Sequence, residues 1–489
     1  METVILSCFV VYTALLFLIM WLTSRRNSGN DAYFRGNRRS PWYVVAYGMI
    51  GASLSGVTFM SVPGYVQGTQ FTYIGVIIGY LIGYAVIALV LLPLYYKLNL
   101  TSIYTYLDRR FGTASHKTGS FFFIVSRLLG SSLRMFLVVF VLYEFVFKAW
   151  GIPFWVPAVV FIILILLYTF RGGIKTVIWT DTLQTTFFLL ATIITIVAVL
   201  NELDMSFGDL IAAVSEKGYA KMFETDWRAD NYFVKQILSG IFITVAMTGL
   251  DQDMMQKNLT CKSLKDAQKN MFTFAVSLIL VNFLFLALGA SLLYYSEQTG
   301  FVLPQKPDQI FPSVAFHIST FTSVVFVLGL VAAGYSSADG TLTALTTSFC
   351  YDFLHFDSAD ERYSEKQKTR IRKWVHIGFA LLYLLVIIAF EPFHSDSLIG
   401  TVFEVAGFTY GPLLGLFVFG MLSKRKVNDK LVPVVAVLSP IICYILKMNS
   451  EAWFNGYRFG FEILILNGAL TCLGLLLLSK KEKINETEH

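Results

Sequence analysis

Three stretches of this 489-residue chain place groups that can bind ions within long apolar runs. The first, 48–64, is crowded with small and hydroxyl residues and ends at the pair Pro63-Gly64. A helix of this composition that unwinds within a membrane would leave backbone carbonyls free to bind a cation. Close helix packing through the small residues is the alternative explanation.

The second stretch places hydroxyl and carboxylate groups on one predicted helix. Residues three and four apart share a helix face, so Ala333 lies beside Ser336 and Ser337. By the same spacing, Ser336 lies beside Asp339 and Gly340. Oxygen donors gathered on one face are what a hard cation such as sodium requires. Hydroxyls bonded back to their own helix are the alternative, but they do not explain the carboxylate.

Asp181 and two arginines are the remaining charged groups of interest within apolar runs. Asp181 lies one turn or more inside its run and needs a cation, a proton or a basic partner. Arg134 lies roughly 24 Å from the inner end of its run at 1.5 Å per residue. Its fork geometry suits a carboxylate. The alternatives are a pair with an acid such as Glu404 or a side chain that snorkels outward, and Arg127 is interpreted as structural.

The elements that position these groups follow from composition. The chain is 56% apolar and 14% charged, whereas soluble domains are typically about a quarter charged, which argues against a cytosolic enzyme or nucleic-acid-binding protein. A helix needs about 20 apolar residues to cross a membrane. We predict an all-α membrane protein with thirteen transmembrane helices, at approximately 4–22, 44–66, 70–96, 118–147, 152–170, 176–199, 233–254, 271–295, 320–350, 374–391, 395–421, 430–446 and 459–478.

The basic residues orient these helices. If the N-terminus lies outside, the predicted inner loops hold 28 of the 38 lysines and arginines, Lys257 among them, and the outer loops hold 7. Cytoplasmic loops carry such an excess. We therefore predict a plasma (inner) membrane protein with its N-terminus outside and its C-terminus in the cytoplasm.

Several motifs in chain order resemble the sodium/solute symporter family, whose members carry sugars, proline, pantothenate, iodide and sialic acid. Residues 172–184, GGIKTVIWTDTLQ, look like the family signature. Similar family motifs occur at 100–112, at 251–252 with 262–263, and at 410–415. The resemblance implies a LeuT-like fold, in which two five-helix repeats have inverted topology. One extra helix precedes the repeats and two follow.

The resemblance also sets the expected domain boundaries. These are 1–43 for the extra N-terminal helix and inner loop, 44–199 for the first repeat, 200–232 for an outer loop, 233–421 for the second repeat, and 422–489 for the two C-terminal helices and inner tail.

The function implied is sodium-coupled symport by alternating access, and no enzymatic activity. In its site residues the chain is most similar to the sialic acid symporters, which implies a small anionic solute, a carboxylate-bearing sugar acid. A hexose, proline or pantothenate is the alternative solute. A solute sensor and an uncoupled channel are the alternatives from other classes. The expected partners are this solute and the lipid bilayer, without nucleic acid, and a monomer would suffice for transport.

The resemblance implies two cation sites that hold one or two sodium ions. The site common to the family corresponds to the carbonyls of Gly51, Leu54 and Ala333 with the hydroxyls of Ser336 and Ser337. A second site found in sialic acid symporters corresponds to Asp181, Ser336, Asp339 and Gly340.

At the second site the chain departs from those relatives, which have serines at the positions of Asp339 and Gly340. Two carboxylates that share a site repel each other, so one carries a proton or a cation bridges them. We expect Asp339 to strengthen this site and to favour coupling to two sodium ions over one. A proton at the site is the main alternative.

The resemblance implies a solute site as well. Ser55, Thr58 and Arg134 look like the positions at which sialic acid symporters hold their substrate, and the unwound region adds Ser53. Gln67 and Gln70, at the outer mouth, are further candidates for contact with the solute.

Overall fold

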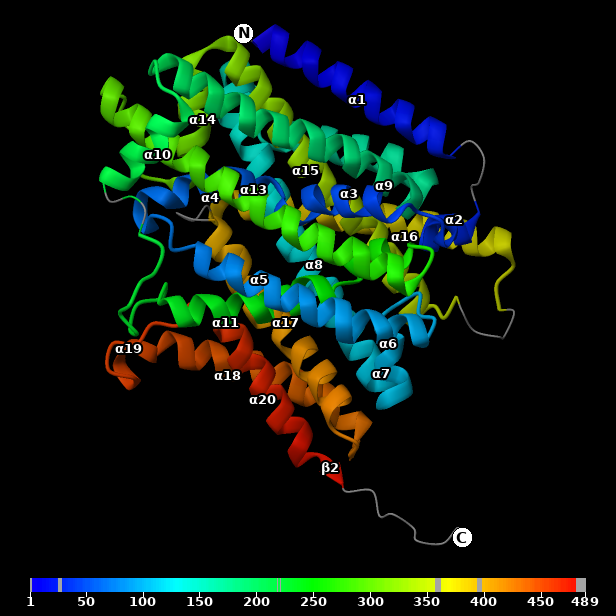
Figure 1. Ribbon diagram of the computed structural model, residues 1–489. Coiled ribbons are helices and arrows are strands. Elements are labelled where there is room, and N and C mark those ends of the chain that lie inside the picture. Colours follow the sequence, from blue (N-terminus) through cyan, green and yellow to red (C-terminus); the bar gives the residue numbers. More distant parts are fainter. Residues whose placement is uncertain are drawn as a thin grey trace, which may run out of the picture.

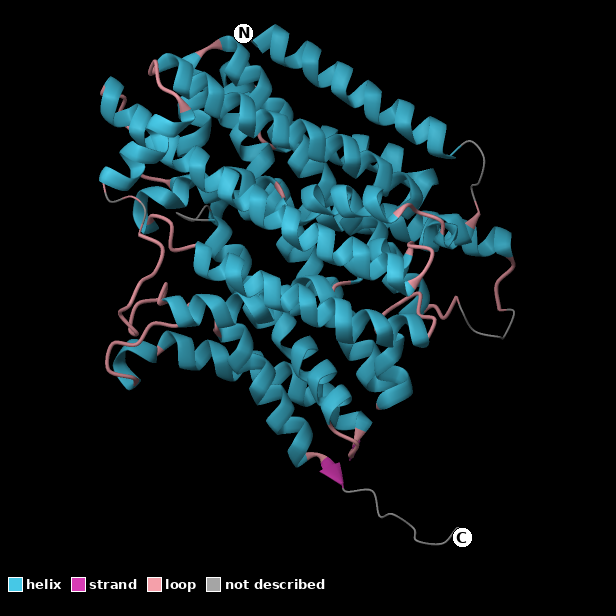
Figure 2. Ribbon diagram, in the orientation of Figure 1, coloured by secondary structure: helices cyan, strands magenta, loops and turns pink. Residues whose placement is uncertain are grey.

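The computed structural model describes residues 2–24, 29–217, 219, 221–356, 362–393 and 398–480. Over these residues the chain is almost entirely helical (Figure 2), and its single strand pair joins β1 (Lys426–Val427) to β2 (Ser479–Lys480). The predicted all-α class is confirmed. Arg25 and Arg26, which we assign to an inner loop, and the tail 481–489 lie outside the described residues.

Nine helices in the described ranges are long and apolar enough to cross a membrane. Two bent pairs raise this number to 11: α3 (Trp42–Leu54) with α4 (Gly56–Thr69), and α11 (Phe233–Thr244), extended by the π-helical η5 (Val245–Gly249), with α12 (Gln252–Leu259). The other two predicted spans coincide with shorter apolar helices at 155–170 and 463–477. The count of thirteen therefore stays a prediction.

The remaining helices complete the two halves of the molecule. Those that precede or lie between the bent pairs are α1 (Glu2–Ser24), α2 (Asn30–Arg35), η1 (Gly36–Arg38), α5 (Ile74–Val86), η2 (Ile87–Leu91), α6 (Leu92–Lys97), α7 (Thr105–Arg110), α8 (Thr113–Leu142), η3 (Tyr143–Phe147), η4 (Lys148–Trp150), α9 (Trp155–Glu202) and α10 (Phe207–Glu216). Those that follow are α13 (Leu264–Thr299), α14 (Pro307–Ile318), α15 (Thr320–Ser348), η6 (Phe349–Phe353), α16 (Glu365–Phe390), η7 (Glu391–Phe393), α17 (Leu398–Leu422), η8 (Asp429–Leu431), α18 (Val432–Met448), α19 (Ser450–Trp453) and α20 (Ile463–Leu477).

Local sequence explains where α15 begins and where α9 turns, and both helices carry predicted site residues. α15 begins at a capping box, in which Ser319 and Thr322 each accept a hydrogen bond from the other's backbone N–H. α9 turns sharply at Gly173, where φ is +51°. A β-carbon there would lie 2.5 Å from the ring of Tyr33, so the turn and the close approach both require glycine.

The helices form one body with distinct edges and ends. Figure 1 shows α1 along one edge and α18 and α20 at the opposite edge, with α3, α8, α9, α13 and α15 between them. At one end of the helices lie α2, α6, α7 and β2, and at the other lie α10, α14 and α19 (Figure 1). The start of α16 lies at the same end as α2, since Asn30 of α2 donates to Glu365 of α16 at 2.8 Å. The segments that we predict to be inner loops therefore converge at one end.

Candidate functional site

Two helices bend where their backbone is interrupted. α3 and α4 meet at 61° across Ser55, whose φ of +28° is uncommon for a residue other than glycine. α11, with η5, and α12 meet at 65°, and the carboxylate of Asp251 caps α12 by accepting a hydrogen bond from Met254 N at 3.1 Å. Helix ends leave backbone groups without intrahelical partners. The predicted unwound helix is confirmed: it breaks at Ser55, within the region expected to unwind, and Pro63 continues inside α4.

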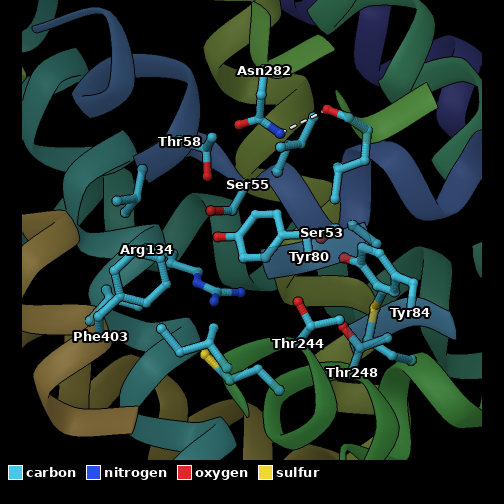
Figure 3. A pocket seen from close by; sticks show the side chains of 18 of the residues that line it. Ser53, Ser55, Thr58, Tyr80, Tyr84, Arg134, Thr244, Thr248, Asn282 and Phe403 are labelled. Atoms are coloured by element: carbon cyan, nitrogen blue, oxygen red, sulfur yellow. Dashed lines mark hydrogen bonds between the residues drawn. The ribbon is translucent and has the colours of Figure 1, made fainter. Parts of the chain in front are cut away.

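A polar cavity lies beside the first bend. Its volume is about 70 Å³, so in this structure the cavity is narrower than a typical small-molecule site. Four of the six predicted solute residues line it, and Figure 3 shows them around the same space: Ser53, Ser55, Thr58 and Arg134.

Arg134 is the charged group that stands out in this cavity. Arg134 is 9% exposed, and its guanidinium forms no hydrogen bond or ion pair with any residue that the structure describes. Glu404, considered above as its partner, pairs with Lys447 at 2.5 Å instead. A desolvated guanidinium without a counter-ion is costly, so the cavity is suited to an anion.

Gln67 and Gln70 are not among the residues that line this cavity. They lie at the far end of α4, where their neighbours Gly68 and Thr69 line a second, larger cavity. Tyr73 lines both cavities, and its hydroxyl lies 3.0 Å from that of Tyr80. The two glutamines are therefore separated from the other four predicted residues.

The cavity includes polar residues that the sequence did not single out: Tyr80, Tyr84, Thr244, Thr248 and Asn282 (Figure 3). The amide of Asn282 donates to Leu278 O at 2.7 Å, while its Oδ1 atom is buried without a partner among the described residues. The two tyrosines and the two threonines are each four residues apart, which places each pair on one helix face. This four-residue spacing was the signal in the sequence that could have identified the two pairs.

Residues of the predicted common sodium site come from α3 and α15. Gly51 N donates to Thr185 Oγ1 at 3.0 Å, and a β-carbon on Gly51 would lie 3.4 Å from Ser336 Oγ. The first bend and the serine pair of α15 are thus brought together. The hydroxyl of Ser337 lies 3.4 Å from that of Ser131 on α8. Leu54 and Ala333 are buried.

Asp181 and Asp339, predicted for a second cation site, are both fully buried. Ser336 donates to Asp181 Oδ1 at 2.6 Å, and the Nζ atom of Lys257 lies 2.9 Å from Asp181 Oδ2. Asp339 instead accepts hydrogen bonds from Tyr168 and other neutral groups. Lys257, which we counted in an inner loop, instead belongs to α12, which extends five residues beyond the predicted end of its span. There its side chain is buried.

A further buried ion pair joins α8 to α12. Arg127 contacts Asp251 at 3.6 Å and also pairs with Asp253. Tyr410 of α17 donates to the same Asp251 carboxylate at 2.5 Å. Lys257 lies 3.5 Å from Asp253, so the two cations share a carboxylate. These residues form a connected group, which we call the charged cluster: Arg127, Asp181, Asp251, Asp253 and Lys257.

The chain is similar in sequence to known transporters. The sodium/sialic acid symporter NanT of Aliivibrio fischeri is 26% identical over 461 residues, which cover 92% of this chain and 88% of NanT. The sodium/sialic acid symporter SiaT of Proteus mirabilis is 26% identical over 471 residues, 94% of this chain and 93% of SiaT.

Similarity of structure extends over nearly the whole chain. A solved substrate-bound, outward-open state of a Na+-coupled sialic acid symporter matches with a TM-score of 0.83 at 23% identity, covering 98% of this chain and 99% of the other. The predicted LeuT-like fold is confirmed. The family model of the sodium:solute symporters matches residues 33–431. Sodium is accordingly the coupling ion, the protein is a transporter and not an enzyme, and the chain belongs to the sodium:solute symporter family.

Proposed function

We propose that the protein imports a carboxylate-bearing sugar acid such as sialic acid together with sodium, by alternating access. The observation that carries this proposal is the guanidinium of Arg134, which lies in the cavity without a partner among the described residues. A guanidinium binds a carboxylate through two parallel hydrogen bonds. Ser53, Ser55 and Thr58 supply hydroxyls that can bond to those of a sugar. The names of NanT and SiaT support the same solute.

We assign the coupling sodium ion to the junction of α3 and α15. Its ligands are the carbonyls of Gly51, Leu54 and Ala333 and the hydroxyls of Ser336 and Ser337. Carbonyl dipoles and hydroxyls bind a monovalent cation without a formal counter-charge, so the ion can leave again. An ion held there would tie the bent helix to α15 and thereby favour the conformation that binds the solute. Each ligand then raises the affinity for the other.

We further propose that the protein lies in the plasma membrane with its N-terminus outside. The convergence of α2, α7 and β2 at one end of the molecule supports this orientation (Figure 1), since the basic loops of the sequence belong to these segments.

Uptake into proteoliposomes tests the solute. We expect an inward sodium gradient to drive accumulation of radiolabelled N-acetylneuraminic acid, and an equal potassium gradient not to. Arg134→Gln should lower the apparent affinity at least about 30-fold, the loss expected when one partner of a buried charge pair is removed. The neutral methyl ester of the same sugar should not compete. Competition by glucose, proline or pantothenate, with none by the sugar acid, would favour the alternative solutes.

The sodium site has its own test. We expect the double change Ser336→Ala/Ser337→Ala to abolish the sodium dependence of uptake. Ser291→Ala is the control, since this buried serine of α13 bonds to Leu288 O of its own helix. Uptake that ignores sodium in the unaltered protein would show an uncoupled channel and reject the proposal.

A further inference from the structure

Lys257 lies at the place where a second coupling ion was expected. Its Nζ atom lies 2.9 Å from Asp181 Oδ2 and 3.5 Å from Asp253 Oδ1, and its side chain is 1% exposed. An ammonium group is a compact monovalent cation, so it neutralises a carboxylate as a sodium ion would. We propose that the ammonium group of Lys257 takes the place of a second coupling sodium ion, so that the transporter binds and carries one sodium ion per cycle.

Three of the four carboxylate oxygens of Asp181 and Asp339 accept hydrogen bonds, and the fourth, Asp181 Oδ2, has only the charge contact with Lys257 among the described residues. Asp181 receives Ser336 at 2.6 Å on one oxygen and faces Lys257 with the other. Asp339 is surrounded by four neutral donors: Tyr168 OH at 2.9 Å, Thr180 Oγ1 at 3.3 Å, Gln184 Nε2 at 3.4 Å and Gly340 N at 2.6 Å. The two carboxylates therefore do not bridge a shared cation in this arrangement, and a second ion would have to displace the lysine.

Gly340 fits the same arrangement. A β-carbon at this position would lie 2.5 Å from Asp253 Oδ1, so a serine there would push the Asp253 carboxylate away. Asp253 is the carboxylate that Lys257 shares with Arg127. The glycine thus removes one hydroxyl ligand from the expected second site and makes room for a carboxylate that binds the lysine. The departure from the serine pattern at 340 is thereby explained.

A tethered cation changes the electrical balance of transport. Lys257 cannot cross the membrane, so it contributes no charge to the transport cycle. One sodium ion with a monoanion moves no net charge. Two sodium ions would move one positive charge and draw on the membrane potential, about 2.3 kcal/mol per charge per 100 mV. This inference rests on the proposed sodium site, but it does not depend on the identity of the solute.

Equilibrium binding of ²²Na⁺ to the purified full-length protein in detergent tests the proposal without any solute. We expect one saturable site per chain and a Hill coefficient near one. Lys257→Gln should expose the Asp181 carboxylate and raise the number of bound ions to two. The double change Lys257→Gln/Asp181→Asn is the matched control, because it removes both charges, and it should return the count to one.

The outcomes are distinguishable. Two ions bound by the unaltered protein, or one ion bound by Lys257→Gln, would overturn the proposal. If Lys257→Gln does not fold, the count in the unaltered protein decides alone. Absence of saturable ²²Na⁺ binding would overturn the proposed sodium site as well, whereas failure to transport sialic acid would affect only the assignment of the solute.

Discussion

One helix, α8, carries two arginines that both line the cavity at the α3/α4 bend but differ in their partners. Arg127 enters the charged cluster and pairs with Asp251 and Asp253. Arg134, seven residues later, faces the cavity at the α3/α4 bend and has no such partner in the described part of the chain. Both are buried. The difference between them is therefore one of pairing and not of burial.

The two bends show the same contrast. At the α3/α4 bend the polar groups are neutral hydroxyls, Ser53, Ser55 and Thr58. At the bend before α12 they are charges that are already paired with one another, two cations with three carboxylates. Paired charges hold helices together, while an exchangeable ligand needs groups whose hydrogen-bonding capacity is still available. The presence of a charged partner thus distinguishes charges that stabilise the fold from charges that are available to bind a solute.

Removal of each arginine is the strongest test of this contrast. Arg127→Met leaves two buried carboxylates without their guanidinium, so we expect a loss of about 3–5 kcal/mol in the free energy of unfolding. Arg134→Met removes a charge without a partner, so we expect a change within about 1 kcal/mol, together with loss of solute binding. Thermal unfolding in detergent measures both. Equal destabilisation by the two changes would break the comparison.

A matched pair of tyrosines gives a smaller effect. Tyr410 donates to the carboxylate of Asp251 at 2.5 Å, whereas the Tyr80 hydroxyl meets that of Tyr73 at 3.0 Å. Hydrogen bonds to charged groups contribute about 1.5–3 kcal/mol and neutral ones about 0.5–1.5 kcal/mol. Tyr410→Phe should therefore destabilise the protein more than Tyr80→Phe in the same unfolding assay. The reverse order would contradict the assignment of charge to the second bend.

Packing against the charged cluster can be tested at Gly340. Gly340→Ala places a methyl group 2.5 Å from Asp253 Oδ1, and overpacking of this kind costs about 1–3 kcal/mol. Gly378→Ala is the control, because nothing lies within 4 Å of a β-carbon there. We expect only the first change to lower the unfolding temperature. A tolerated Gly340→Ala would mean that Asp253 can move.

The all-α membrane class could be predicted from the sequence because length and apolar content define a membrane span, whereas the LeuT-like architecture came from the family resemblance. The position of the first bend was also predicted, because the unwound region was expected around Ser53, Ser55 and Thr58 and the helix breaks at Ser55. Pro63 continues inside α4, since proline is tolerated inside membrane helices when neighbouring groups satisfy the freed carbonyl.

The charged cluster could not be predicted for a different reason. Asp181 and Lys257 are 76 positions apart, and nothing local says which basic residue reaches which carboxylate. Lys257 also follows the apolar run, so its charge was read as an inner-loop anchor. Arg127 was predicted to be structural, and the structure pairs it with Asp251 and Asp253. Arg134 was predicted to bind the solute, and this stays a prediction, although Arg134 lines the cavity. The depth of a residue along a span can be estimated from the sequence, whereas its charged partners are set by the tertiary structure.

The smallest expected effect concerns two positions predicted together for the solute. Thr58 lines the cavity, whereas Gln67 lies exposed beyond it. Thr58→Val keeps the shape and removes one hydroxyl, so the loss of about 1 kcal/mol should weaken solute binding about fivefold. Gln67→Ala should change it less than about twofold. Half-maximal concentrations of the sugar acid in sodium-driven uptake measure both, and a larger effect at Gln67 would move the solute site toward the outer cavity.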